Sequence, residues 1–177
     1  MAFTTPWFNV LGCTVQDMPG TDGDQLYYSL KPPDYVSVLA VTPDRQVLLV
    51  RQFRPAVDAY TLELPSGHVE PHETPEQAGH RELTEETGFI ARSLEHLGTL
   101  NPDTGRLSNR LWCYLARDVR SPADRGVPEE GLELVTYPLD ELWSLIADGT
   151  FDHAINLATV ALAVVRRVNT TVGPPLI

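Results

Sequence analysis

The stretch GHVEPHETPEQAGHRELTEETGF, residues 67 to 89, contains six glutamates, one arginine and no lysine. Its second half has the signals of a helix that begins at Pro75 and ends before Gly88. Thr74 is a suitable N-cap, and Gln77 completes a capping box with it. The sequence therefore predicts a helix that holds several of these carboxylates.

Three glutamates crowd one side of the predicted helix. Glu82 and Glu86 are four residues apart and so are neighbours, and Glu85 lies on the adjoining strip. Like charges at this spacing destabilise a helix by roughly 0.2–0.5 kcal/mol per pair, and only Arg81 is placed to offset them. The charge pattern alone leaves two interpretations, a solvated acidic surface or a site for a divalent cation, which Mg²⁺ would fit because it binds oxygen ligands.

The fixed residues of this stretch resemble the Nudix box, G-x5-E-x7-R-E-U-x-E-E-x-G-U, in which U is a bulky apolar residue. Gly67 and Glu73 match the first two positions, and RELTEETGF at residues 81–89 matches the rest. So long a match favours the cation site over the acidic surface. The resemblance implies an α/β fold, the Nudix α/β/α sandwich with a mixed sheet, and hydrolysis of a nucleoside diphosphate linked to another moiety.

The resemblance also implies roles for individual residues. Glu82 and Glu86 would bind Mg²⁺, or Mn²⁺ in its place, with Glu85 as a further ligand or as a partner of Arg81. The backbone carbonyl of Ser66 would complete the metal shell. Metal ions would neutralise the pyrophosphate and lower the pKa of the attacking water.

Two further positions of the box concern packing. Glu73 and Arg81 would hold the loop and the helix together. Gly79 stands where the family often has alanine. A helical glycine costs up to about 1 kcal/mol, so we expect it to mark a close approach of another element.

Outside the box, the chain resembles the ADP-ribose pyrophosphatase branch of the family. VLLVRQFRP and LELPSGHVE are similar to that branch's Q-[FY]-R and E-x-P-A-G forms, and the N-terminal strands are similar too. In that branch these strands form an intertwined homodimer, and aromatic side chains stack on adenine. The resemblance implies a strand extension over residues 1–33, for dimerisation and base stacking, and a Nudix hydrolase domain over residues 34–177.

The resemblance suggests five substrate-binding residues, each with a plain alternative. Trp7 and Tyr28 would stack on the base, or else they are core or interface aromatics. Arg51 and Arg54 would contact phosphate or ribose, or else form surface salt bridges. Glu63 would hydrogen-bond the ligand or orient an arginine, or else pair within the sheet.

The branch also has a late-loop glutamate that acts as catalytic base or as ligand of a metal-bound water. Glu130 matches its spacing best, and Glu129 is the alternative. NPDTGRLSNR, residues 101–110, departs from the branch because its serine-proline pair is missing. Gly105 would fill the glycine position, and Asn109 stands where an acidic residue is usual. That loop usually meets the sugar, so the sugar preference stays open.

The composition is that of a globular domain. The 177 residues are 42% hydrophobic and 21% charged, and the formal net charge of −11 argues against a general nucleic-acid binder. Cys13 and Cys113 are too few for a disulfide framework or a structural zinc site, and we expect buried thiols. No signal peptide or membrane span is evident, so we expect a cytoplasmic protein without a membrane partner.

The order of elements predicts a mixed sheet with helices packed on it. A short helix follows the last strand, with Asp140 as its expected cap, and a second long helix comes next. The strands are expected at residues 7–17, 25–31, 35–42, 46–53, 60–67, 94–100, 110–119 and 132–139, and the two later helices at 140–149 and 153–168.

The sequence thus predicts Mg²⁺-dependent hydrolysis of ADP-ribose, or a related nucleoside diphosphate sugar, to a nucleoside monophosphate and a sugar phosphate. One alternative is the same chemistry on GDP-mannose, a UDP-sugar, a dinucleotide or a damaged nucleoside triphosphate, which the unusual loop 101–110 favours. The other is an ADP-ribose-binding module without catalysis. Such modules usually lose box glutamates, whereas this chain keeps them.

Overall fold

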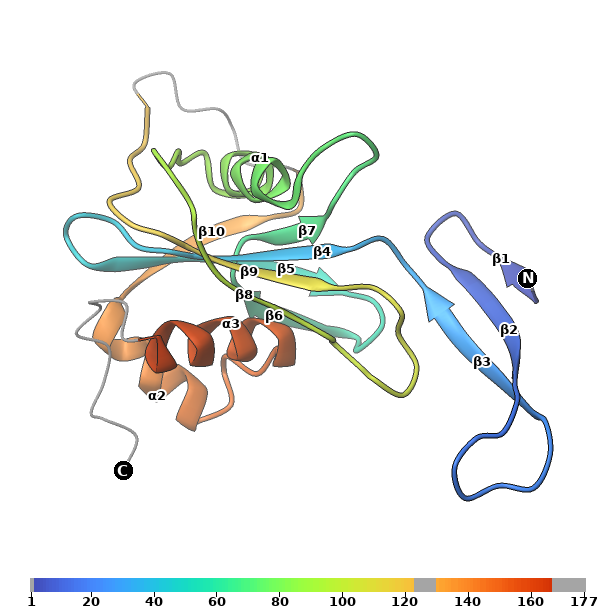
Figure 1. The fold of residues 1–177 in the computed structure, drawn as a ribbon. Coiled ribbons are helices and arrows are strands. Elements are labelled where there is room, and N and C mark those ends of the chain that lie inside the picture. Colours follow the sequence, from blue (N-terminus) through green and yellow to red (C-terminus); the bar gives the residue numbers. More distant parts are fainter. Residues whose placement is uncertain (1, 123–129, 167–177) are drawn as a thin grey trace.

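The structure, a computed structural model, describes residues 2–122 and 130–166 (Figure 1). Most predicted elements are confirmed with shorter bounds. The strands are β1 (Phe3–Thr4), β2 (Asn9–Val15), β3 (Gln25–Lys31), β4 (Tyr35–Ala40), β5 (Gln46–Arg54), β6 (Ala59–Glu63), β7 (Ser66–His68), β8 (Glu95–Leu100), β9 (Leu111–Ala116) and β10 (Glu133–Pro138). The helices are α1 (Pro75–Thr87), the 3-10 turn η1 (Leu139–Glu141), α2 (Leu142–Ala147) and α3 (Ala154–Val165).

The described strands form three sheets, in the orders β1-β2-β3, β10-β5-β6 and β7-β4-β9-β8. Strands β4 and β9 run parallel, whereas β4 and β7 run antiparallel. The predicted mixed sheet is therefore confirmed, although the strands divide between separate sheets. Helix α1 packs against β4, β7 and β5.

Strand β4 is buried on both faces because a helix covers each one. Val38 belongs to the same apolar cluster as Leu83 of α1, and the next residue, Leu39, belongs to the cluster that contains Val160 of α3. Alternate residues of a strand point to opposite faces, so α1 and α3 lie on opposite sides of the sheet. Figure 1 shows α1 above the sheet and α2 and α3 below it. This arrangement is the expected α/β/α sandwich.

Helix α1 has the ends that the sequence predicts. The Thr74 side chain accepts from the Gln77 N–H, and the Gln77 side chain accepts from the Thr74 N–H at 2.7 Å, so the capping box is complete. Gly88 ends the helix with φ 69°, the left-handed conformation that glycine adopts without strain. The close approach at Gly79 is confirmed, because a Cβ there would lie 2.7 Å from Cδ1 of Leu94.

Two local predictions were wrong. Asp140 does not cap the short helix, because the chain enters the turn η1 first and Asp140 pairs instead with Arg45 at 2.9 Å. Cys13 is exposed, not buried, since it lies in β2 of the N-terminal sheet, where most side chains face solvent. Cys113 is buried in β9 as expected.

The sheet β1-β2-β3 projects from the rest of the protein in Figure 1. Several of its large apolar side chains are exposed, including Trp7 at 73%, Leu26 at 60% and Tyr28 at 57%. A parallel bridge between Leu30 and Leu107 connects it to the loop before β9. Contiguous exposed apolar surface marks an interaction site, so this sheet is expected to pack against something else.

Among the described residues, no helix has the length and apolar character needed to cross a membrane.

We predict that Thr74→Ala lowers the free energy of unfolding by about 1 kcal/mol, because it removes the side-chain half of the capping box. Urea unfolding followed by circular dichroism measures the difference. Thr84→Ala is the matched control, because the Thr84 hydroxyl bonds only the carbonyl of His80 within the same helix. A control loss equal to that of Thr74→Ala would show that the cap contributes nothing specific.

Candidate functional site

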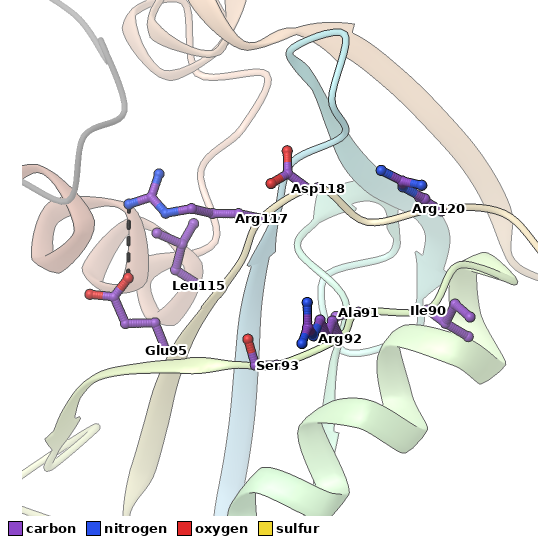
Figure 2. A pocket seen from close by; sticks show the side chains of 9 residues that line it. All are labelled: Ile90, Ala91, Arg92, Ser93, Glu95, Leu115, Arg117, Asp118 and Arg120. Atoms are coloured by element: carbon purple, nitrogen blue, oxygen red, sulfur yellow. Dashed lines mark ion pairs between the residues drawn. The ribbon is translucent and has the colours of Figure 1, made fainter.

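One concave region lies beyond the end of α1, between residues 90–95 and 115–120, and has a volume of about 650 Å³. Figure 2 shows three arginines around it, with Arg117 directed at Glu95, and these two side chains approach to 3.8 Å. It contains none of the acidic residues of α1. The site residues predicted from the sequence therefore lie elsewhere.

A second concave region, of about 790 Å³, brings the candidate residues together, and we call it the box pocket. Its lining comes from α1, β7 and β5, from Trp7 in the N-terminal segment, and from residues 130–132 just before β10. It is lined by Trp7, Tyr35, Gln52, Phe53, Arg54, Ser66, Gly67, His68, Glu70, Arg81, Glu82, Glu85, Glu86, Glu130, Gly131 and Leu132.

Arg81 ties the loop before α1 to the helix. Its guanidinium donates to both carboxylate oxygens of Glu73, at 2.7 and 3.2 Å, and to the carbonyl of His68 at 2.9 Å. It also donates to Glu82 at 2.8 Å and to Glu85 at 3.0 Å. A single arginine therefore connects three carboxylates and the end of β7, as expected for the pair Glu73–Arg81. The Glu73 pair is mostly shielded from solvent, which strengthens it relative to a surface pair.

Glu86 lies deeper than the other pocket glutamates and is only 6% exposed. Its Oε2 accepts from the backbone N–H of Ser66 at 2.9 Å. Burial raises the pKa of the Glu86 carboxyl to about 8, the Ser66 N–H opposes that rise, and the charges of Glu82 and Glu63 add to it. The charged form of Glu86 is thus disfavoured unless positive charge arrives.

Glu82 has a similar environment. Burial raises the pKa of its carboxyl, Arg81 lowers it, and the charges of Glu85 and Glu73 raise it again. Gly67 makes room for this carboxylate, because a Cβ at Gly67 would lie 2.0 Å from Glu82 Oε1. A side chain at position 67 would therefore collide with the Glu82 carboxylate in its present position.

These residues fit a hard divalent cation. The donor atoms are carboxylate and carbonyl oxygens, which such cations prefer, and the electrostatics of Glu82 and Glu86 favour added positive charge. The described residues contain no group of three or more His, Cys, Asp or Glu side chains already arranged as a metal cage. In this arrangement Arg81 engages Glu82 and Glu85, and the Ser66 N–H engages Glu86.

Arg54 and Glu63 form a bidentate pair at the wall of the box pocket. Arg54 Nε donates to Glu63 Oε1 at 2.7 Å, and a terminal nitrogen donates to Oε2 at 2.6 Å. Glu63 also accepts from Thr61 at 2.6 Å, and His153 lies 3.2 Å from it. Burial would raise the pKa of the Glu63 carboxyl, but the hydrogen bonds from Arg54, His153 and Thr61 hold it well below its usual range. Glu63 thus orients an arginine that faces the pocket.

The other predicted site residues, three for substrate binding and Glu130 for catalysis, divide into two groups. Trp7 and Glu130 line the box pocket. Tyr28 lies on β3 and covers Gly12 instead. Arg51 points to a different face of β5, where it pairs with Glu133 at 3.0 Å and lies 4.2 Å above the ring of Tyr60. The alternative base, Glu129, lies outside the described residues.

The unusual loop 101–110 does not line the box pocket. It packs along β3, where the N–H of Leu30 donates to the Arg106 carbonyl. Asn109 is buried and donates to the carbonyl of Pro33 at 2.9 Å, so it serves the junction between β3 and β4. Gly105 lies in a turn closed by the side chain of Asp103.

The sequence analysis missed several pocket residues. No role was predicted for His68, yet it lines the pocket, and its ring packs edge-on against Tyr35 at 5.4 Å. Tyr35 was assigned to a strand without any role. The alternation of a strand predicts which side chains are buried, but it does not predict which of them line a given pocket. No sequence signal therefore identifies His68 and Tyr35 as residues of the box pocket.

Comparison with known proteins gives a consistent result. Residues 31–159 match the family model described as NUDIX domain. The chain is 28% identical over 139 residues to the ADP compounds hydrolase NudE of Escherichia coli (strain K12), covering 78% of this chain and 75% of that protein. It is 34% identical over 90 residues to the ADP-ribose pyrophosphatase of Bacillus subtilis (strain 168), covering 51% and 49%. A crystal structure of an ADP compounds hydrolase superposes with a TM-score of 0.80 at 24% identity, covering 97% of this chain and 92% of that one.

We predict that Glu63→Gln lowers the free energy of unfolding at pH 7 by about 2 kcal/mol, because hydrogen bonds to charged groups contribute about 1.5–3 kcal/mol. The folded pKa of Glu63 is depressed, so its contribution is complete above its unfolded pKa of about 4.3 and is lost as the pH falls. The difference in free energy of unfolding between wild type and Glu63→Gln should therefore be constant above about pH 5 and become smaller below it. Urea unfolding at a series of pH values measures it.

The matched control is Glu133→Gln, since Glu133 also pairs with an arginine of β5, Arg51, but is largely exposed. We expect this control to change stability by less than about 1 kcal/mol. Equal losses in the two variants would contradict the assignment of Glu63 as a buried anchor.

Proposed function

This chain belongs to the Nudix family and is a hydrolase, and from that premise we propose that it hydrolyses the pyrophosphate bond of ADP-ribose or a related nucleoside diphosphate sugar. The products would be a nucleoside monophosphate and a sugar phosphate. The observation that supports this most is the box pocket, in which Glu82, Glu86, Arg54 and Trp7 share one cavity. The names of the relatives from E. coli and B. subtilis point to the same substrate class.

Nudix hydrolases generally need a divalent metal, and we propose Mg²⁺, held by Glu82 and Glu86, by Glu85 and by the Ser66 carbonyl. When bound, Mg²⁺ would neutralise the pyrophosphate and lower the pKa of a bound water. Arg81 orients these carboxylates, because its guanidinium donates hydrogen bonds to both Glu82 and Glu85. Mn²⁺ fits the same oxygen donors.

The remaining residues would position the substrate and the attacking water. Glu130 is exposed at the rim next to Gly131, where it can accept a proton from a water in the pocket. Arg54 would contact a phosphate or the ribose, with its guanidinium oriented by Glu63. Trp7 offers an exposed ring for stacking on the base. Tyr28 and Arg51 would reach a substrate only through a second protomer, because neither lines this pocket.

The test is a panel of ADP-ribose, GDP-mannose, UDP-glucose, NADH and nucleoside triphosphates, each incubated with the protein and Mg²⁺ and analysed by chromatography. We expect AMP and ribose 5-phosphate chiefly from ADP-ribose. If another compound is hydrolysed faster than ADP-ribose, that compound becomes the proposed substrate, and the proposed pyrophosphate hydrolysis still holds. Tight ADP-ribose binding without turnover would identify a binding module instead.

We predict that removing divalent metal with EDTA abolishes turnover and that added Mg²⁺ restores it.

Glu86→Gln should lower kcat by at least about 100-fold, the range typical of a lost electrostatic group in a catalytic site. The matched control is Glu76→Gln, an exposed glutamate in the first turn of the same helix, which should retain wild-type kcat. Normal turnover by folded Glu86→Gln would contradict the metal assignment.

We also propose that residues 1–33 form a dimerisation extension of the Nudix domain at residues 34–177. The exposed apolar side chains of β1-β2-β3 support this, because an uncovered apolar sheet face marks an interface. Light scattering should give a mass near twice 19.6 kDa. Leu26→Lys should give monomers, whereas Asp22→Lys, in the nearby turn, should remain dimeric. A monomeric wild-type protein at micromolar concentration would contradict the proposal.

A further inference from the structure

Helix α3 contains a polar residue where its sequence is otherwise almost entirely apolar. The helix reads AINLATVALAVV, and Asn156 is completely buried, 0% exposed, near its N-terminal end. Asparagine is a poor helix former and an unpaired buried amide is costly. Asn156 therefore needs partners, and these partners lie far away in the sequence.

The side chain of Asn156 bonds three groups of the central sheets. Its Oδ1 accepts from the backbone N–H of Leu64 at 3.1 Å. Its Nδ2 donates to the hydroxyls of Ser66 and Ser37, at 3.1 and 3.0 Å. Since Nδ2 has two hydrogens, both are used. The amide thus holds the turn between β6 and β7 against β4.

A neighbouring histidine fixes which way this amide points. The Nδ1 atom of His153 lies 3.0 Å from Asn156 Oδ1 and 3.2 Å from Glu63 Oε2. Both contacts are to acceptor atoms, so Nδ1 carries the hydrogen and donates. If the amide of Asn156 were reversed, its NH2 group would face both the Nδ1–H of His153 and the N–H of Leu64. Each of these contacts would then bring two donors together.

Ser66 connects this network to the box pocket. Its hydroxyl donates to the Leu64 carbonyl at 2.6 Å and accepts from Asn156. Its backbone N–H, on the other side, donates to Glu86 at 2.9 Å. A path of direct hydrogen bonds therefore runs from α3, below the sheet, through residue 66 to Glu86 of α1, above it.

We infer that Asn156 is a positioning residue of the box pocket: it fixes the turn at Leu64–Ser66 from the α3 side, and so fixes Ser66 where its backbone meets Glu86 and the divalent cation. This inference rests on the proposed metal site. Asn156 touches neither substrate nor cation, because its partners are Leu64, Ser37, Ser66 and His153. Groups that orient metal ligands in this way typically change metal affinity or activity by about 10- to 100-fold when removed.

A second buried polar residue of α3 provides a matched comparison. Thr159 is also 0% exposed and lies one turn beyond Asn156. Its hydroxyl donates to the Ile155 carbonyl within the helix and contacts the thiol of Cys113. Within the part of the chain that the structure describes, the Thr159 hydroxyl does not bond the β6–β7 turn, so replacing it affects the packing of α3 without loosening Ser66.

The test compares Asn156→Ala and Thr159→Val with the wild-type protein. Binding of Mn²⁺ to the metal-free protein is measured by electron paramagnetic resonance, and kcat and KM are measured with Mg²⁺ and the best substrate of the panel. We expect Asn156→Ala to weaken Mn²⁺ binding and to lower kcat, each by about 10- to 100-fold, with KM within about threefold of the wild type. Thr159→Val should keep Mn²⁺ binding and kcat within about threefold, even where its melting temperature falls equally.

Wild-type Mn²⁺ binding by folded Asn156→Ala would overturn the inference. So would equal weakening in Thr159→Val, since that would make the effect a general loss of packing. A wild-type protein that turns over no compound in the panel but binds Mn²⁺ would refute the proposed substrate class, and the Mn²⁺ comparison would still decide the role of Asn156. A wild-type protein that binds no Mn²⁺ would overturn both.

If Asn156→Ala does not fold, Ser66→Ala tests the same link, because it removes the hydroxyl that Asn156 holds and leaves the backbone N–H that binds Glu86. Weaker Mn²⁺ binding by Ser66→Ala supports the inference. Unchanged Mn²⁺ binding by Ser66→Ala overturns it.

Discussion

The arrangement of the site depends on the hydrogen bonds of Arg81. Several carboxylates lie close together on α1 and in the loop before it, and their mutual repulsion would otherwise drive them apart. Arg81 offsets this repulsion and also donates to the carbonyl of His68, at the end of β7. The loop therefore closes over the helix in a chain whose net charge is −11. Burial raises the pKa of the Glu82 and Glu86 carboxyls, and the charges of neighbouring carboxylates add to that rise.

The parts of the fold that could be predicted are those set by local chemistry. The capping box at Thr74, the left-handed Gly88 and the crowding at Gly79 all follow from neighbouring residues, and the structure has each of them. The prediction for Asp140 failed for a similar local reason, since a 3-10 turn precedes the helix and moves the residue out of the capping position. The exposure of Cys13 depends on what covers the N-terminal sheet, which pattern alone does not reveal.

The site was predictable to the extent that it lies within one continuous stretch. Spacing brings the glutamates of α1 together, and resemblance adds Trp7 and Glu130, which line the same pocket. Residues 51 and 54 look equivalent in the sequence, yet an odd separation places them on opposite faces of β5, and only Arg54 meets the pocket. Asn156 could not be found at all, because the sheet residues that it bonds, Leu64, Ser66 and Ser37, lie 90 or more positions away in the sequence.

The arginine-rich composition has a practical consequence at β3. Lys31 is the only lysine side chain in the sequence, and it lies at the end of β3, opposite Asn9. It is exposed, in the sheet whose apolar side chains lack a cover. Amine-directed fluorophores, crosslinkers and sensor-chip couplings will therefore attach at this sheet or at the α-amino group. Such reagents label a single defined lysine, but immobilising the protein through Lys31 would block the sheet whose apolar side chains are exposed.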